Sequence, residues 1–308
     1  MHRAMFLSCA FNRPSCVVRR TSNLGGKRMT ELQLPSNARE EAITTARAAG
    51  AILCERLQHV RTIAFKGTVD LVTDADRASE ALIAARITDA FPSHRLLGEE
   101  GARGASDSGE HAPEYGWIVD PLDGTTNYAH GYPHFAVSIA LEQQGTVILG
   151  VVYDPMRDEL FVAERGGGAT LNGVPLHVST VDQLIRGLLA TGYPYDIDQR
   201  GETAALWNIF VNAAQGTRRD GAAALNLAYV AAGRLDGFWE RPLQPWDIAA
   251  GGLLVSEAGG RVTSYDHGPF DPYRREVIAS NGLIHGAMVA VIDETMASRS
   301  DTNGEGRG

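Results

Sequence analysis

The sequence has few of the features that mark disulfide-rich, membrane-spanning or nucleic-acid-binding proteins. Its three cysteines are too few for a disulfide framework in 308 residues, so a reducing, cytoplasmic location is expected. No apolar run reaches the roughly 18–20 residues that a membrane-spanning helix needs. The net charge of −9 argues against general nucleic-acid binding, which favours basic surfaces. We therefore expect neither a membrane nor a nucleic acid as partner.

The rest of the composition is that of an ordinary globular protein. Hydrophobic residues make up 44% of the chain and charged residues 21%, which is enough to bury a large core. The length favours about two domains, although one large α/β unit would also fit.

Both ends of the chain differ from the rest in composition. Residues 1–28 contain several arginines and no acidic residue, which suits a transit peptide or a nucleic-acid-binding arm. A disordered tail, or a true start at Met29, explains the same composition, and we favour this explanation. We predict a disordered basic extension over residues 1–36 and a second disordered tail over residues 296–308.

Between these ends, the hydrophobic pattern predicts two halves of different type. In residues 37–183, helices starting near Asn37 and near Asp76 come before a group of strands, an α+β arrangement. In residues 184–295, strands and helices alternate, so this half is expected to be α/β. The alternation of large and small residues over 135–141 predicts a strand with one buried face.

Acidic residues collect in four short segments. Three of them lie where a strand or loop meets an expected helix start, where free N–H groups favour anions. Each segment taken alone therefore reads as a helix cap or a turn. The segments are Asp70–Asp76, Gly98–Glu100, Asp120–Asn127 and Pro245–Asp247.

The third segment, DPLDGTTN, is hard to explain as an ordinary turn. Pro121 fixes φ and Gly124 permits a tight turn, so the carboxylates of Asp120 and Asp123 can converge. Without a Lys or Arg in the segment, the two carboxylates repel unless a cation is bound. Carboxylates suit Mg²⁺, whereas the nine histidines are scattered and lack the spacing of zinc ligands. Amides following Gly124 could face a phosphate, and the pattern as a whole indicates phosphoryl chemistry.

Taken together and in order, the four segments resemble those of the inositol monophosphatase family, bacterial type. DPLDGTTN is similar to the first family signature, and WDIAAGGLLVSEAGG at residues 246–260 is similar to the second. The likeness runs from about Asn37 to about Asp293. It implies Mg²⁺-dependent, lithium-sensitive phosphomonoesterase activity with two or three Mg²⁺ ions, or Mn²⁺ in their place. It also implies a homodimer and a layered αβαβα sandwich of the sugar-phosphatase type, mixing α+β and α/β.

The resemblance implies a role for each matching position. The metal ligands would be Glu99, Asp120, the Leu122 carbonyl, Asp123 and Asp247. Thr125, with Glu99 or Asp76 nearby, would orient and help to deprotonate the attacking water. The amides of Gly124 and Thr125 would hold the phosphate, and Lys66 would lie on a loop that closes toward the metals. The substrate-side residues would be Gly221, Ala222, Ala223, Glu240 and Asp247.

Departures from the family pattern leave the metal ligands untouched and concern the expected substrate wall. Ala222 stands where many members have Ser or Thr, and Asn226 where bacterial members often have Asp. These departures put the identity of the substrate in doubt. Glu240 could instead form an ion pair with Arg241, although adjacent residues pair poorly, and Trp246 reads as a packing residue.

Three functions are compatible with this sequence. The first is hydrolysis of a small polyol or sugar phosphate, above all inositol 1-phosphate to inositol and phosphate, by metal-activated water. The second keeps this chemistry and acts on fructose 1,6-bisphosphate, histidinol phosphate or a 3′-phosphorylated nucleotide. The third is a regulatory protein that binds transcription machinery or RNA, which only the arginine-rich amino terminus supports.

Overall fold

A computed structural model describes residues 32–57, 63–65, 71–102 and 113–305. From Leu32 onward these residues belong to one compact unit. The basic segment 1–31, Lys66 and Asp70 lie outside the described residues, so the expectations for them stay predictions. None of the helices in the described ranges is both long and apolar enough to cross a membrane.

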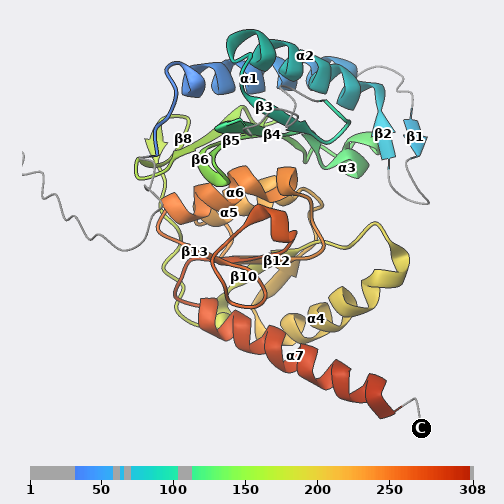
Figure 1. The fold of residues 1–308 in the computed structure, drawn as a ribbon. Helices are drawn as coiled ribbons and strands as arrows, with labels where there is room; N and C mark the ends of the chain where they lie inside the picture. The colour runs from blue at the N-terminus through green and yellow to red at the C-terminus, as the bar shows by residue number, and fades with distance from the viewer. Residues whose placement is uncertain (1–31, 58–62, 66–70, 103–112, 306–308) are drawn as a thin grey trace, which may run out of the picture. The chain divides into compact units, whose positions relative to one another are not determined.

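The first layer consists of two outer helices, α1 (Ala38–Leu57) and α2 (Asp74–Ala90), which lie side by side (Figure 1). Helix α1 buries small residues and one leucine at helical spacing, which lets α2 and the sheet beneath approach closely. Helix α2 begins two residues before the expected start at Asp76, because Thr73 caps it. The Thr73 amide donates to Asp76 Oδ2 at 2.9 Å, and the Thr73 hydroxyl accepts from the Ala75 amide at 3.2 Å.

The second layer is a seven-stranded sheet with strand order β3-β4-β5-β6-β7-β8-β9. Strands β3 and β4 are parallel, and each later pair is antiparallel. The strands are β3 (Arg95–Gly98), β4 (Tyr115–Asp123), β5 (Ala136–Gln143), β6 (Thr146–Asp154), β7 (Glu159–Glu164), β8 (Gly168–Leu171) and β9 (Val174–Pro175). A separate two-stranded ribbon joins β1 (Ile63–Phe65) to β2 (Leu71–Thr73).

Strand β5 corrects one expectation, because both of its faces are buried rather than one. Its large residues belong to the core under α1 and α2, whereas its small residues Ala136 and Ala140 belong to the core on the other face. Small side chains on this face let a helix pack close to the sheet. The Ser138 hydroxyl, for example, donates to the Trp246 carbonyl at 3.2 Å.

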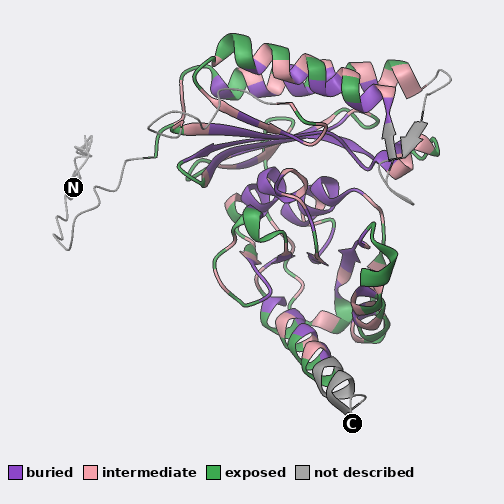
Figure 2. Cartoon of the chain, turned by 45° about the vertical axis from the view of Figure 1, so that its right-hand side comes forward, coloured by how far each residue is buried: buried purple, intermediate pink, exposed green. Residues whose placement is uncertain are grey.

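The third layer consists of α5 (Ala223–Ala231) and α6 (Pro245–Glu257), most of whose residues are buried (Figure 2). The fourth layer is a five-stranded mixed sheet with order β11-β10-β12-β14-β13. Helices α4 (Arg200–Ala213) and α7 (His285–Glu305) form the last layer. The strands of the fourth layer are β10 (Leu188–Thr191), β11 (Gly216–Arg218), β12 (Gly237–Glu240), β13 (Arg261–Thr263) and β14 (Val277–Ser280).

The observed order of layers is the expected αβαβα sandwich. The expected boundary between residues 183 and 184 separates the two large sheets, but the described residues form one compact unit, so two domains stay a prediction. The expected disordered tail from residue 296 is wrong as far as Glu305, because α7 continues through it. Two residues of α7 at this point contact the rest of the protein: Met296 packs against the core and Thr295 is buried. These contacts support the helix at residue 296.

Candidate active site

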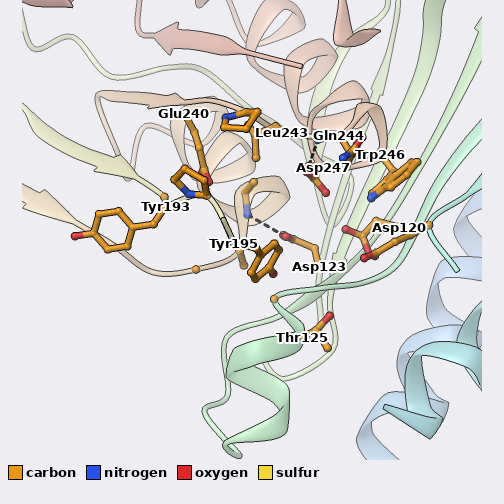
Figure 3. A pocket seen from close by; sticks show the side chains of 18 of the residues that line it. Asp120, Asp123, Thr125, Tyr193, Tyr195, Glu240, Leu243, Gln244, Trp246 and Asp247 are labelled. Carbon is orange, nitrogen blue, oxygen red and sulfur yellow. Dashed lines mark hydrogen bonds between the residues drawn. The ribbon is translucent and has the colours of Figure 1, made fainter. Parts of the chain in front are cut away.

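A cavity of about 440 Å³ opens between the ends of the two large sheets, and it is lined from both halves of the chain. It is lined by every predicted site residue that the structure describes except Asp76. Figure 3 shows Asp120 and Thr125 on one side of this cavity and Glu240 with Tyr193 on the other. The predicted residues that line it are Glu99, Asp120, Leu122, Asp123, Gly124, Thr125, Gly221, Ala222, Ala223, Glu240 and Asp247.

The acidic side of the cavity is built by the end of β4, which carries the segment DPLDGTTN. Asp120 pairs with Ser138 of β5 and Asp123 with Ala136, so the strand bulges between the two acids. The Leu122 amide donates to Asp120 Oδ1 at 2.9 Å, which holds this side chain over the bulge. Gly124 then turns the chain at φ 92° into the short helix α3 (Thr125–Ala129). The segment is thus a bulged strand followed by a turn, and both carboxylates reach one cavity.

Asp123 connects this strand to the middle helix layer. Its carboxylate accepts hydrogen bonds from the amides of Ala223 at 3.0 Å and Ala224 at 2.9 Å, and a longer one from Leu225 at 3.4 Å. These amides are the free donors at the start of α5, where Ala222 has no side-chain group to cap them. Asp123 therefore acts as the cap of a helix that begins a hundred residues later in the chain.

Asp247 enters the cavity from the first turn of α6. Its Oδ2 accepts from the Gln244 amide at 2.7 Å, drawn as a dashed line in Figure 3. Glu99, which follows β3, completes the acidic side. Four carboxylates from three separate segments therefore meet where strands and helices end.

The electrostatics of this side show that the carboxylates affect one another. Burial, and then the negative charges of Glu99, Asp123 and Asp247, raise the pKa of Asp120 well above its usual range. Burial and the charge of Asp247 likewise raise the pKa of Asp123, although its three amide partners oppose the shift. Such a group of carboxylates is stable as anions only when positive charge is supplied.

The donor chemistry fits a hard divalent cation such as Mg²⁺, since the site offers carboxylate and carbonyl oxygens at the end of a buried strand. Within the described ranges, however, no three His, Cys, Asp or Glu side chains form a ready-made metal cage. The donor chemistry fits a cation although the side chains do not form a cage, because the carboxylates of Asp123 and Asp247 are turned toward backbone amides. Rotation of these side chains can redirect their oxygen atoms toward a cation, whereas the negative charge stays in the buried site.

Thr125 lies between this acidic side and a buried acid behind it. The Thr125 hydroxyl is 3.1 Å from Asp76 Oδ1 and 3.1 Å from the Leu122 carbonyl, and both can accept its single proton. Asp76 is fully buried and does not line the cavity, so it can act on a substrate only through Thr125. Its burial raises the pKa of Asp76, and the hydrogen bonds from Thr73 and Thr125 oppose that shift.

The opposite side of the cavity carries Glu240, at the end of β12. Burial, and then the charge of Asp247, raise the pKa of Glu240 to about 8, while Arg219 lowers it. The alternative of an ion pair with Arg241 is wrong, because Arg241 binds Glu202 with two hydrogen bonds of 2.5 and 2.6 Å. Glu240 therefore lines the cavity and does not form an ion pair with its neighbour Arg241.

Several cavity residues escaped the sequence prediction. Tyr193 and Tyr195 follow β10, and Arg219 follows β11 with its guanidinium 5.2 Å from the centre of the Tyr193 ring. Trp246, interpreted as a packing residue, both packs against the core and lines the cavity. The signal that could have found them is the alternation of strands and helices in this half, which favours parallel strands. Strands β10, β11 and β12 are indeed parallel, so the residues after them meet at the same edge of the sheet.

This fold and this cavity define the class of layered phosphomonoesterases that the acidic segments indicated. A model of the "Inositol monophosphatase family" matches residues 35–297. The chain belongs to the inositol monophosphatase family.

Named relatives of this chain carry two kinds of description. It is 44% identical over 256 residues to "Nus factor SuhB" of Pseudomonas aeruginosa, covering 82% of this chain and 94% of that one. It is 43% identical over 260 residues to the "Inositol-1-monophosphatase" of Mesorhizobium japonicum, covering 83% and 96%. Among solved structures, the extragenic suppressor protein suhB of Bartonella henselae matches with a TM-score of 0.78 and 41% identity, covering 83% and 98%.

Proposed function

We propose that the protein is a Mg²⁺-dependent phosphatase that hydrolyses a phosphate monoester of a small polyol or sugar, with inositol 1-phosphate as first candidate. The observation that carries this proposal is the single cavity in which Glu99, Asp120, Asp123 and Asp247 meet the Gly124–Thr125 turn. The relative named inositol-1-monophosphatase supports the choice of substrate, at 43% identity.

On this proposal the acidic side holds the cations and the phosphate. Glu99, Asp120 and the Leu122 carbonyl would hold one ion, and Asp120, Asp123 and Asp247 would surround a second. Bound divalent ions supply a more acidic water and positive charge for the leaving oxygen. The buried, amide-rich surroundings keep these carboxylates in place, so that little reorganisation is needed during the reaction.

Thr125 and its neighbours would orient the attacking water and help to remove its proton. The Thr125 oxygen has a lone pair for that proton when its own hydrogen points to Asp76 Oδ1 or to the Leu122 carbonyl, each 3.1 Å away. Asp76 positions Thr125, and Glu99 lies on the cavity wall where it can help. The amides of Gly124 and Thr125 would hold the phosphate oxygens at the start of α3.

The other side of the cavity would bind the alcohol half of the substrate. Glu240 can exchange hydrogen bonds with hydroxyl groups, and Gly221, Ala222 and Ala223 provide a wall without bulky side chains. Arg219 and the tyrosines at 193 and 195 extend this wall. The alternatives fructose 1,6-bisphosphate, histidinol phosphate and a 3′-phosphorylated nucleotide differ mainly in what they place here.

Phosphate release tests the proposal directly. We expect release from inositol 1-phosphate that needs Mg²⁺, is abolished by a chelator, and is lost in Asp120→Asn. The matched control is Asp89→Asn at the exposed end of α2, which should behave as wild type. Equal rates for wild type and Asp120→Asn would reject the proposal, and ranking kcat/KM over a panel of esters would decide among the substrates. Inhibition by millimolar LiCl is expected as well, because a small monovalent ion can occupy the weaker metal position.

A second candidate function rests on the relative named Nus factor SuhB, 44% identical to this chain. We infer from that name a regulatory role in which the chain binds transcription machinery or RNA. Binding of RNA polymerase or RNA would be measured with the full chain, with residues 1–28 removed, and with Asp120→Asn. Absence of binding in all three forms would exclude this role. The homodimer and the cytoplasmic location stay predictions.

A further inference from the structure

Gly192 is a buried glycine between β10 and the Tyr193–Tyr195 wall, and it lines the cavity. Strands β10 and β12 are parallel, and their register pairs Ala190 with Phe238 and Thr191 with Trp239. The next positions in this register are Gly192 and Glu240. The Thr191 hydroxyl donates to the Trp239 carbonyl at 2.6 Å, which holds the two strand ends together at this point. Gly192 and Glu240 therefore lie side by side at the edge of the sheet.

The Glu240 carboxyl group occupies the space that a side chain at position 192 would need. An ideal Cβ on Gly192 would lie 2.0 Å from Glu240 Oε1, 2.2 Å from Cδ and 2.2 Å from Oε2. The three atoms are the whole carboxyl group, and no other atom is nearer to that Cβ. The carboxyl group thus rests against the bare backbone of Gly192.

The backbone of Gly192 does not itself require glycine. Its φ lies outside the left-handed region, which other glycines of this chain do occupy. The nearest obstacle to a side chain is therefore the tip of Glu240, and that tip can rotate. A methyl group at position 192 would displace the carboxyl group and leave the strand intact.

Little else holds the Glu240 carboxyl group. No described residue donates a hydrogen bond to it or pairs with it as an ion, and the charges of Asp247 and Asp123 repel it. Arg219 attracts it, but this side chain is exposed and lies over the Tyr193 ring. Contact with the flat surface of Gly192 is thus the main constraint on its position.

We propose that Gly192 is a positioning residue, whose missing side chain leaves the space from which the Glu240 carboxyl group meets the alcohol half of the substrate. The inference rests on the proposed phosphatase function, because that function makes the position of this carboxyl group matter. Gly192 touches no reacting atom. It acts through Glu240, and so it affects substrate recognition more than the chemical step.

The first test compares Gly192→Ala with wild type, using inositol 1-phosphate and Mg²⁺. We expect KM to rise about tenfold, the cost of one displaced hydrogen-bonding group, while kcat changes by less than about threefold. The matched control is Gly286→Ala in α7, where an added Cβ would meet no atom within 4 Å. A Gly192→Ala enzyme with the KM of wild type would overturn the proposal.

The second test asks whether Gly192 acts through Glu240. In a Glu240→Gln background, Gly192→Ala should change KM by less than about twofold, because the group it displaces already fails to bind normally. Glu240→Asp should rescue Gly192→Ala, since its carboxyl group is one methylene shorter and clears the new Cβ. Effects of the two substitutions that simply multiply, or a failure of Glu240→Asp to improve Gly192→Ala, would contradict the inference.

A third readout does not depend on catalysis. A crystal structure of Gly192→Ala should show the Glu240 carboxyl group displaced, with β10 and β12 unchanged. An inactive wild type would reject the phosphatase proposal, and this structure would still decide the role of Gly192. Should Gly192→Ala not fold, folding of Gly192→Ala combined with Glu240→Asp would support the contact. Failure of both variants to fold would show that the strand itself needs glycine, and would overturn the proposal.

Discussion

The two sides of the cavity are held in place by different means. On the acidic side, Asp120 and Asp123 are buried and accept hydrogen bonds from backbone amides, and Asp247 is fixed by the Gln244 amide. On the opposite side, Glu240 rests against a glycine, and Arg219 lies exposed over a tyrosine ring. Hydrogen bonds fix the positions of the side chains on the acidic side, whereas steric contact with Gly192 fixes the position of Glu240 on the opposite side.

This difference indicates which properties of the protein can change easily. Moving a carboxylate on the acidic side breaks hydrogen bonds between elements, so the chemistry is costly to alter. Moving a group on the opposite side needs only a different side chain at the end of a strand. Of the two departures from the family pattern, Ala222 lines the cavity where the two sides meet, whereas Asn226 is buried in α5 and does not line the cavity.

After the loss of activity expected for Asp120→Asn, the largest effect is expected from Thr125→Ala, also on the acidic side. It removes the hydroxyl shared between Asp76 and the Leu122 carbonyl, and general acid–base groups contribute about 10²–10⁴-fold, so kcat should fall by about that much. Steady-state kinetics at saturating Mg²⁺ measure this effect. The control Thr125→Ser keeps the hydroxyl and should retain most of the activity. A rate close to wild type for Thr125→Ala would break the distinction between the two sides.

A smaller effect is expected on the opposite side, from Glu240→Gln. KM for inositol 1-phosphate should rise about tenfold, and kcat should change less, because this carboxyl group contacts the alcohol and not the phosphate. An aryl phosphate without hydroxyl groups provides the comparison, since its kinetics should hardly change. If both substrates lost kcat equally, Glu240 would belong with the chemistry of the acidic side.

The carboxyl groups on both sides of the cavity should make the stability of the protein depend on pH. The pKa values of Asp120, Asp123 and Glu240 are raised in the folded protein, so the folded state binds more protons than the unfolded state above about pH 4. The stability of the metal-free protein therefore decreases as the pH rises through the folded pKa values. We expect thermal unfolding in EDTA to occur about 5 °C lower at pH 9 than at pH 6.

Millimolar Mg²⁺ should reverse most of this decrease, since cations bind the ionised carboxylates and stabilise the folded state. Differential scanning fluorimetry measures both effects, with Asp120→Asn as the variant that should show a weaker dependence on pH. A metal-free protein that becomes more stable toward pH 9 would contradict the electrostatic description of the acidic side.

The smallest expected effect comes from Ala222→Ser, where the two sides meet. Asp123 already accepts from the first amides of α5, so a serine there should change the free energy of unfolding by less than about 0.5 kcal/mol. Urea denaturation of the metal-free protein measures the change. A lower stability would mean that the close approach of Gly124, whose ideal Cβ lies 3.3 Å from the Ala222 Cβ, leaves no room for a hydroxyl.

The convergence of Asp120 and Asp123 could be predicted because its determinants are local, whereas the places of Glu99 and Asp247 were implied by the family resemblance. Pro121, Gly124 and the spacing of the two aspartates lie within eight residues, and they indicated that the carboxylates converge. The structure adds that a bulge at the end of β4, and not a free turn, brings them together. Hydrophobic periodicity predicted an α+β half and an α/β half, whereas the αβαβα layering was implied by the family resemblance. The small residues of β5 hid its second buried face.

The remaining features depend on contacts that periodicity does not reveal. Capping of α5 by Asp123 joins residues a hundred positions apart, and the only local sign is an alanine where a cap is usual. The wall of Tyr193 and Arg219 arises because three strands run parallel, and strand direction is a property of the whole sheet. The continuation of α7 past residue 296 depends on the packing of Met296 and Thr295 against the core.

Because the Asp123 carboxylate fastens β4 to the first amides of α5, it is a poor choice for making an inert form of the protein. A substitution there would loosen a helix as well as remove a cation ligand, and the two losses could not be told apart. Among the residues that the structure describes, Asp120 accepts a hydrogen bond only within its own strand, from the Leu122 amide. An Asp120→Asn protein is therefore better suited than an Asp123 variant to binding an unhydrolysed ester while the rest of the molecule stays intact.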